Sequence, residues 1–262
     1  KIEIPCEFGV LSRKEEPKDY ELEDSFIKNS APVKETRKDT DAWHIDGTPE
    51  ENGFLNITNF QMSSDLIRSM AREKNVTVNT FLTAVLLKSI LNLQFDIIKN
   101  PKKYKPVKVL VPINLRPIFD SKTLRNFSLY TIPELDPRLG DYSLDEIISI
   151  VHHKVGMYAT KKNMSKMIET NVADERVLAL RLTPLIIKNM VMKLVFNAVG
   201  EKKSCLSFSN LGEIKLPEEM KKYIDRIDFI LGSQAQAPYN CSAYSYKGTL
   251  NVTFSRDIKE SR

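Results

Sequence analysis

The pattern of apolar positions predicts two long helices. Residues 78–98 carry apolar side chains at helical spacing. Residues 183–199 are apolar over most of their length and begin with Thr183 and Pro184, a pair typical of a helix start. Because both apolar faces are broad, we expect these two helices to form the main apolar cover of a sheet.

Capping signals predict two further helices. Ser63 or Ser64 can cap a helix that begins just after them. Ser143 and Glu146 have the spacing of a capping box, so another helix is expected from there to about Tyr158.

Alternating apolar and polar residues predict strands between these helices and after them. The expected strands are 54–57, 105–113, 127–132, 204–209, 227–231, 239–246 and 250–254. Lys247 and Gly248 give a tight-turn signal between the last two strands. Helices and strands are mixed without the regular alternation of a doubly wound sheet. The pattern therefore favours an α/β fold (an α+β sandwich), with a mixed β-sheet flanked by helices.

The first 52 residues differ from the rest. Residues 12–52 are polar, charged and poor in periodic apolar positions, with at most a short helix near residues 20–28. A connector of this length is unusual inside a compact domain. We therefore expect residues 1–52 to be a connector that crosses over from another part of a larger protein. Residues 53–262 are expected to form the folded subdomain.

The composition excludes several classes of protein. Hydrophobic residues make up 42% and charged residues 28% of the 262 positions, as in ordinary globular proteins. The net charge of +5 is small and no compact Lys/Arg block is present, so no nucleic acid partner is expected. Three widely spaced cysteines form neither a zinc pattern nor a disulfide framework, so we expect no metal and a cytoplasmic location. No apolar run reaches the ~18 residues of a membrane span.

Two short stretches carry candidate chemistry. In residues 111–117, Val-Pro-Ile-Asn-Leu-Arg-Pro, a strand leads into a loop that bears Arg116. In residues 206–212, Leu-Ser-Phe-Ser-Asn-Leu-Gly, alternation places Ser207 and Ser209 on one face of a strand. A row of small polar groups suits the wall of a site. An ordinary surface contact for Arg116 and solvent-facing serines fit the same pattern.

These stretches also carry a resemblance to a known family. In order, the long helix after residues 76–80, the Val-Pro-Ile-Asn-Leu-Arg-Pro stretch and the Phe-Ser-Asn-Leu-Gly strand resemble the C-terminal half of the chloramphenicol-acetyltransferase-like superfamily. That superfamily includes nonribosomal-peptide condensation domains and alcohol acetyltransferases. The bacterial alcohol-acetyltransferase-like branch is the most similar, over roughly residues 20–262.

The resemblance implies a fold and a reaction. The chain would be one half of a CoA-dependent acyltransferase-like pseudo-dimer. It would be part of an enzyme that moves an acyl group from a thioester to a small-molecule acceptor, an alcohol or an amine. Acyl-CoA or an acyl-carrier thioester would be the co-substrate, with no tightly bound cofactor. A non-catalytic binding or scaffold module that kept this fold is the alternative, and a basic pocket for a phosphorylated ligand is a weaker one.

The sequence lacks the motif that carries the general base of this superfamily. The family places a histidine in an HxxxD motif, but the residues four positions after His152 and His153 are Gly156 and Met157. We expect both histidines to be ordinary helix residues. His44, four positions before a threonine, also fails the spacing. The resemblance therefore implies that an N-terminal half of the same protein supplies the catalytic histidine.

The resemblance assigns roles to three residues of this chain. Ser209 takes the position of the serine that stabilises the oxyanion, and its neighbour Asn210 is a weaker candidate. Arg116 takes the position of the arginine that pairs with the aspartate of the missing HxxxD motif. That pair is structural and would orient the histidine rather than move a proton.

Overall fold

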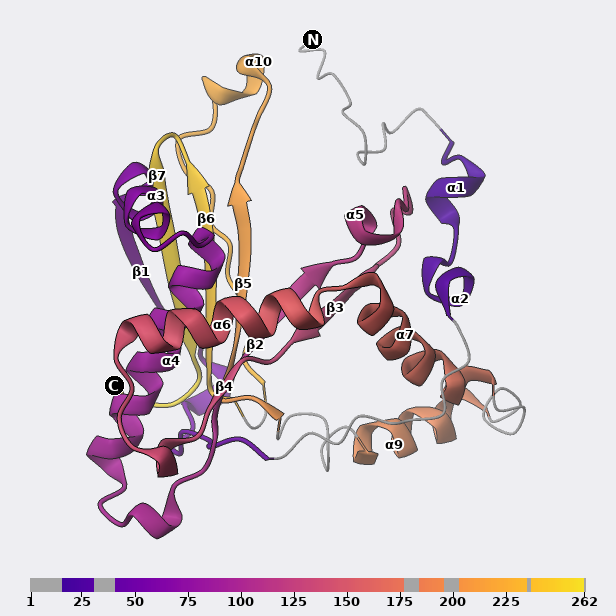
Figure 1. The fold of residues 1–262 in the computed structure, drawn as a ribbon. Helices are drawn as coiled ribbons and strands as arrows, with labels where there is room; N and C mark the ends of the chain where they lie inside the picture. Colours follow the sequence, from indigo (N-terminus) through magenta and orange to yellow (C-terminus); the bar gives the residue numbers. More distant parts are fainter. Residues whose placement is uncertain (1–15, 31–40, 177–183, 196–202, 235–236, 262) are drawn as a thin grey trace.

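The computed structural model describes residues 16–30, 41–176, 184–195, 203–234 and 237–261. A seven-stranded mixed sheet lies at its centre, with helices packed against it (Figure 1). The order of the strands is β1-β7-β6-β5-β2-β3, and β4 pairs with β2. The predicted fold class, a mixed sheet flanked by helices, is confirmed.

The strands combine antiparallel and parallel pairing. β1, β7 and β6 are antiparallel neighbours, β6, β5 and β2 are parallel, and β3 and β4 are antiparallel to β2. The carboxyl ends of β2, β5 and β6 therefore meet at one edge of the sheet. The strands are β1 (Asn56–Ser63), β2 (Val107–Asn114), β3 (Ser128–Thr131), β4 (Glu134–Leu135), β5 (Leu206–Glu213), β6 (Tyr239–Tyr246) and β7 (Thr249–Arg256).

The helices begin at the caps that the sequence offers. Ser63 caps α3 with its side chain, and Ser143 and Glu146 form the predicted capping box of α6. Three 3₁₀ turns occur at Glu51–Gly53, Pro101–Lys103 and Pro137–Leu139. The helices are α1 (Asp19–Leu22), α2 (Ser25–Asn29), α3 (Ser64–Glu73), α4 (Val78–Ile97), α5 (Arg116–Phe119), α6 (Leu144–Tyr158), α7 (Lys161–Arg176), α9 (Leu185–Val195) and α10 (Glu218–Lys221).

The main core lies between the sheet and helices α3, α4 and α6 (Figure 1). Leu87 and Leu91 of α4 are fully buried, as are Val109 of β2 and Phe208 of β5. Among the described residues, α4 is the helix long and apolar enough to cross a membrane. Its packing against β2 and α6 makes it a core helix, as its predicted broad apolar face requires.

A second hydrophobic core lies between the β2–β3 pair and helix α7. Met164 and Ile168 of α7 pack with Leu115 and Phe127, and the ring of Phe26 from α2 meets that of Phe127 at 5.0 Å. The apolar pattern does not predict α7, because the apolar stripe of this helix is narrow and most of its other positions are polar. This second core holds α2 against the folded body.

Part of the expected connector also packs on the sheet. Trp43 and Ile45 lie in the main core, and Pro49 pairs with Ile258 in an isolated bridge. The boundary between residues 52 and 53 stays a prediction, but the ten residues before it belong to the packed structure.

The helix expected at residues 183–199 is present as α9 (Leu185–Val195), but its expected role as apolar cover of the sheet was wrong. Residues 183 and 196–199 lie outside the described part, and within it α9 covers no face of the sheet (Figure 1). Leu185, Ile186 and Leu194 are each about two-thirds exposed or more. Of the two long helices, only α4 serves as apolar cover.

The expected strand at residues 227–231 was also wrong. The carbonyl oxygens of this segment accept hydrogen bonds from side chains of β6 instead of from a neighbouring strand. Tyr244 donates to the carbonyl of Ile227, and Ser242 donates to that of Phe229. The alternating pattern reflects this attachment to β6, which satisfies the main chain without a strand ladder. The predicted turn at Lys247 and Gly248 is confirmed, since both residues have positive φ values.

Candidate functional site

The carboxyl ends of β2 and β5 separate and leave a cavity. The two strands pair only at Val109 with Leu206 and at Leu110 with Ser207. Beyond these pairs, β2 continues beside β3, and β5 continues beside β6. A cavity of 460 Å³ opens at this end of both strands. Its lining residues are Asn79, Pro112, Asn114, Arg116, Asn126, Ser128, Ser209, Asn210, Leu211 and Gly212.

Ser209 lies half-buried on the wall of this cavity. It pairs with Ser242, which pairs with Thr253, which pairs in turn with Asn59. Paired residues point to the same face of a sheet, so these four residues form a polar row across four strands. Phe208 points to the opposite face, into the core beneath the helices. Ser209 therefore lies on the face away from that core. Within the described part of the chain its hydroxyl has no hydrogen-bond partner, so it is available to donate.

Asn210 lines the same cavity because β5 is irregular there. Its Oδ1 atom accepts a hydrogen bond of 2.8 Å from the main-chain N–H of Gly212, whose φ is +73°. The pairing with β6 shifts register between Asn210 and Glu213. The local turn thus brings two successive residues to one cavity, which regular alternation would forbid. The amide oxygen of Asn210 is already used, and only its NH₂ group is left to donate.

Arg116 reaches the cavity from the first turn after β2. Its Nε and Nη2 atoms donate hydrogen bonds of 2.7 Å to the carbonyl oxygens of Thr123 and Arg125. Its Nη1 atom lies 3.4 Å from Oδ1 of Asn114. No carboxylate among the described residues pairs with it. The guanidinium group therefore fixes the loop of residues 120–126 at the border of the cavity.

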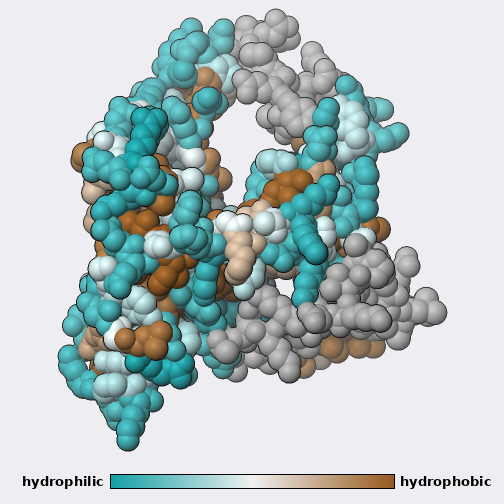
Figure 2. All heavy atoms as spheres, in the orientation of Figure 1, coloured by the Kyte–Doolittle hydropathy of each residue, from teal (hydrophilic) through white to brown (hydrophobic). Residues whose placement is uncertain are grey.

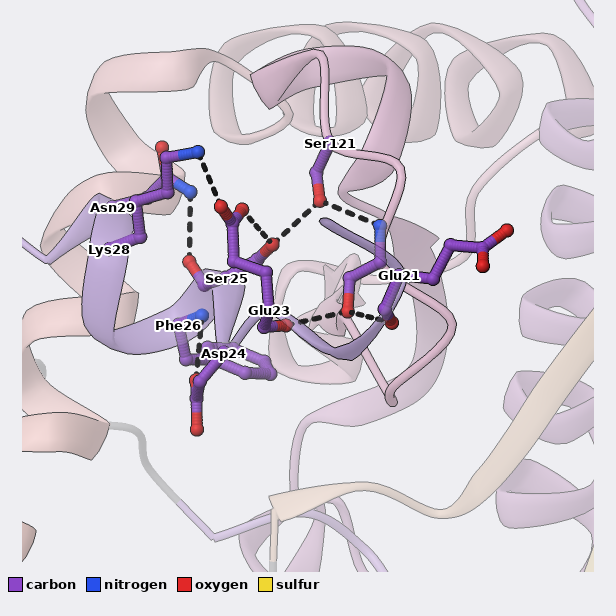
Figure 3. Close-up of polar contacts among 9 residues, drawn as sticks. Glu21, Glu23, Asp24, Ser25, Phe26, Lys28, Asn29 and Ser121 are labelled. Carbon is purple, nitrogen blue, oxygen red and sulfur yellow. Dashed lines mark hydrogen bonds and ion pairs between the residues drawn. The ribbon is translucent and has the colours of Figure 1, made fainter. Parts of the chain in front are cut away.

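The loop held by Arg116 in turn holds the N-terminal segment (Figure 3). The hydroxyl groups of Ser25 and Ser121 lie 2.6 Å apart, and Thr123 donates to the carbonyl of Glu23 at 2.7 Å. The main-chain N–H of Leu124 donates to the carbonyl of Glu21, also at 2.7 Å. Helices α1 and α2 are thus attached to the edge of the cavity. Arg116 thus makes structural contacts with this loop and also lines the cavity.

Three further amides line the cavity and were not predicted. Asn79 comes from the first turn of α4, Asn114 from the end of β2, and Asn126 from the loop before β3. Amide groups both donate and accept hydrogen bonds, so they can position a polar ligand. Asn114 lies inside the Val-Pro-Ile-Asn-Leu-Arg-Pro stretch that carries the resemblance, and that was the available signal.

No histidine of the described residues lines this cavity. His152 and His153 are exposed on α6, where Nδ1 of His153 lies 2.7 Å from the carbonyl oxygen of Ser149. This is the surface position expected for them. His44 lines a separate cavity of 960 Å³ at the opposite end of β2, between the start of that strand and the end of β7. The charged residues of that second cavity have both signs, and none of them is buried.

The two described cysteines are buried and unbonded. Burial raises the pKa of the Cys205 thiol to about 12, and it raises the pKa of the Cys241 thiol to about 12 as well. Both residues are therefore thiols rather than thiolates at neutral pH, and neither suits a covalent mechanism. Cys6 lies outside the described residues.

Comparison with known proteins identifies the fold. No protein-family model and no curated protein matches the chain. Among solved structures, trichothecene 15-O-acetyltransferase from Fusarium sporotrichioides matches with a TM-score of 0.53 and 10% identity, over 80% of this chain and 44% of that one. The wax ester synthase/diacylglycerol acyltransferase from Marinobacter aquaeolei VT8 matches with a TM-score of 0.46 and 10% identity, over 78% and 43%. The epimerization domain from the third module of tyrocidine synthetase B matches with a TM-score of 0.47 and 12% identity, over 91% and 51%.

The chain spans about half the length of these proteins or less. The likeness to the trichothecene acetyltransferase shows a shared fold and, at 10% identity, no more than the fold. The sheet and helices described above therefore share the fold of that acetyltransferase.

Proposed function

We propose that this chain is the C-terminal portion of an acyltransferase that moves an acyl group from a thioester to an alcohol or amine. The single observation that carries the proposal is that Ser209 and Arg116 line one cavity. They lie 93 positions apart in the sequence, and the parallel pairing of β2 with β5 brings their elements together. The fold shared with an acetyltransferase is consistent with this reaction.

The proposed reaction begins with a base from outside the described residues. A histidine of an N-terminal half takes the proton from the acceptor hydroxyl or amine, whose oxygen or nitrogen then attacks the carbonyl carbon of the thioester. The tetrahedral intermediate carries its negative charge on the former carbonyl oxygen. When it collapses, the carbon–sulfur bond breaks, and the thiol leaves with the proton that the base had taken.

Within this proposal Ser209 stabilises the oxyanion. Its hydroxyl is half-buried, lines the cavity and is free of other partners among the described residues, so it can donate to a developing charge without first breaking a bond. Asn210 is the second candidate donor, since the turn at Gly212 engages its amide oxygen and leaves its NH₂ group to donate. One such donor typically contributes about 10²–10³ to the rate.

Arg116 is a positioning residue in this proposal. Its Nη1 side would pair with the aspartate that follows the histidine in the N-terminal half, while its other two donors remain on Thr123 and Arg125. An arginine held in this way is preorganised for a carboxylate partner. The thioester would be acyl-CoA or an acylated carrier, bound as a co-substrate. The two free cysteines support a reducing, cytoplasmic setting.

Release of free thiol from acetyl-CoA, measured on the full-length protein with a panel of alcohols and amines, tests the proposal. Ser209→Ala is expected to lower kcat by about 10²–10³ with an unchanged thermal unfolding curve. Ser207→Ala is the matched control, because Ser207 lies on the same face of the same strand and does not line the cavity. It should keep kcat within a few-fold.

Three outcomes would contradict the proposal or a part of it. Ligand binding without thiol release would support the non-catalytic module. Equal loss of activity in Ser207→Ala and Ser209→Ala would contradict the proposal that Ser209 stabilises the oxyanion. The isolated 262-residue chain should release no thiol, and robust transfer by it would contradict a histidine supplied from an N-terminal half.

A further inference from the structure

Helix α9 exposes an apolar face. Ile186, Ile187, Met190, Val191 and Leu194 follow one another at positions i, i+1, i+4, i+5 and i+8, which share one side of a helix. Each of the five side chains is between 47% and 77% exposed. Figure 2 shows hydrophobic atoms at the lower right, where Figure 1 places α9. Continuous apolar surface of this kind is uncommon on a protein that has no partner for it.

Two lysines flank this face. At about 100° of rotation per residue, Lys193 lies about 20° from Ile186, and Lys188 lies about 60° beyond Val191 on the other edge. Lys193 is exposed, and Lys188 is half-buried. Residues 177–200 contain no aspartate and no glutamate. The only charges in this part of the chain are therefore positive, and on α9 they border the apolar face on both edges.

We propose that α9 lies on the surface of a membrane that contains anionic lipids. Its apolar face would enter the boundary between headgroups and acyl chains, and the stems of Lys188 and Lys193 would run along that boundary with their ammonium groups among lipid phosphates. With 11 residues, α9 is about 16 Å long, roughly half the hydrocarbon thickness of a bilayer. It therefore lies along the surface and does not cross it.

The charge pattern favours a lipid surface over a protein partner. Lysine is depleted where proteins contact one another and enriched at the edges of helices that lie on membranes. The apolar face also holds no polar side chain that would fix the orientation of a protein. This proposal does not depend on acyl transfer, and it holds or fails separately from the proposed reaction.

Flotation with vesicles tests the proposal on the protein as the cell makes it. One set of vesicles is phosphatidylcholine alone, and the other is a two-to-one mixture of phosphatidylcholine and phosphatidylserine. The protein should float with the mixed vesicles, bind phosphatidylcholine vesicles more weakly and dissociate as salt rises. Ile186→Ser with Leu194→Ser should lower binding by about tenfold or more. Lys188→Gln with Lys193→Gln should lower binding to the mixed vesicles by about fivefold for each lysine.

Matched variants keep the test specific. Leu66→Ser with Met70→Ser replaces two exposed apolar side chains of α3, and Lys102→Gln with Lys103→Gln replaces two exposed lysines elsewhere. Both control pairs should float like the wild type. Thermal unfolding monitored by circular dichroism should be unchanged in the lysine variants, because none of these side chains is buried.

Several results would overturn the proposal. One is a folded wild type that stays at the bottom of the gradient with both kinds of vesicle. Another is equal flotation of the wild type and the two α9 variants. A third is a wild type that fails to float and forms a dimer, or protects α9 from hydrogen exchange through its own upstream residues, because a protein surface would then cover this face.

Discussion

The Nε atom of Arg116 donates a 2.7 Å hydrogen bond to the carbonyl oxygen of Thr123, and Thr123 in turn donates to the carbonyl of Glu23. One side chain at the cavity thus holds a loop, and the loop holds helices α1 and α2. Hydrogen bonds from a charged donor contribute about 1.5–3 kcal/mol each when they are shielded from water, and less when half-exposed.

Arg116→Ala is therefore expected to lower the free energy of unfolding by about 1–3 kcal/mol and to speed hydrogen exchange over residues 19–29. Hydrogen exchange with mass spectrometry measures the second effect. Arg138→Ala is the control, since Arg138 is an exposed arginine that pairs only locally with Asp136. Unchanged exchange at residues 19–29 in Arg116→Ala would show that the loop holds the helices without the guanidinium group.

The two histidines of α6 should be dispensable. His152 and His153 are exposed, line neither of the two cavities described above and lie on a helix whose stability comes from its cap and its apolar face. We expect the double change to alanine to leave turnover of the full-length protein within a few-fold. A steady-state assay of thiol release measures this. A loss of about 10³ would mean that one of them transfers a proton.

Glu134 should give the protein part of its stability against acid. Its carboxylate bridges the buried ammonium group of Lys108, at 3.1 Å, and that of Lys154, at 2.9 Å. Burial raises the pKa of Glu134, but the hydrogen bonds from Lys154 and Lys108 outweigh this and hold its pKa below the usual value. Because the pKa is lower in the folded state, this contribution is complete above the ordinary glutamate pKa of about 4.3 and is lost as the pH falls through the folded-state pKa.

Glu134→Gln is accordingly expected to cost about 1–3 kcal/mol at neutral pH, less than a fully buried pair would, since the Glu134 side chain is 41% exposed. Denaturant unfolding at a series of pH values measures the difference from the wild type. That difference should be constant above about pH 5 and shrink below about pH 4. A difference independent of pH would mean that the carboxylate charge contributes nothing.

The thiols of Cys205 and Cys241 should react only after unfolding. Both are buried, and burial raises the pKa of each to about 12, which leaves almost no thiolate at neutral pH. In a Cys6→Ser background, Ellman's reagent should label no thiol of the native protein and two thiols in denaturant. Fast labelling of the native protein would show that the β5–β6 region opens readily.

Local signals in the sequence predicted the local structure well. The caps at Ser63 and Ser143 and the turn at Lys247 depend on residues within four positions of each other, so the pattern was sufficient. The alternation at residues 227–231 misled because a segment attached to β6 by side-chain donors has the same alternating pattern as a strand. Hydrophobic periodicity alone also gave no means of knowing that α9 would be exposed.

The sequence allowed us to predict which residues are candidates for the site, but not that they line one cavity. Ser209 and Arg116 were identified from the resemblance of two short stretches, whereas their common cavity follows from the parallel pairing of β2 with β5. Pairing between distant strands leaves no trace in a single sequence. The turn that brings Asn210 to the cavity depends on the hydrogen bond from Gly212, which regular alternation does not foresee.

The pairing of β1 with β7 has a consequence for the synthesis of the protein. Asn56 pairs with Arg256, 200 positions later. Strand β1 therefore cannot pair until β7 has been synthesised and has left the ribosome. At about 5–20 residues per second, β1 spends some 10–40 s without its neighbour. During that time its main chain is free to pair with other nascent chains. This edge of the sheet should therefore close late, in a step that joins β1 to β7.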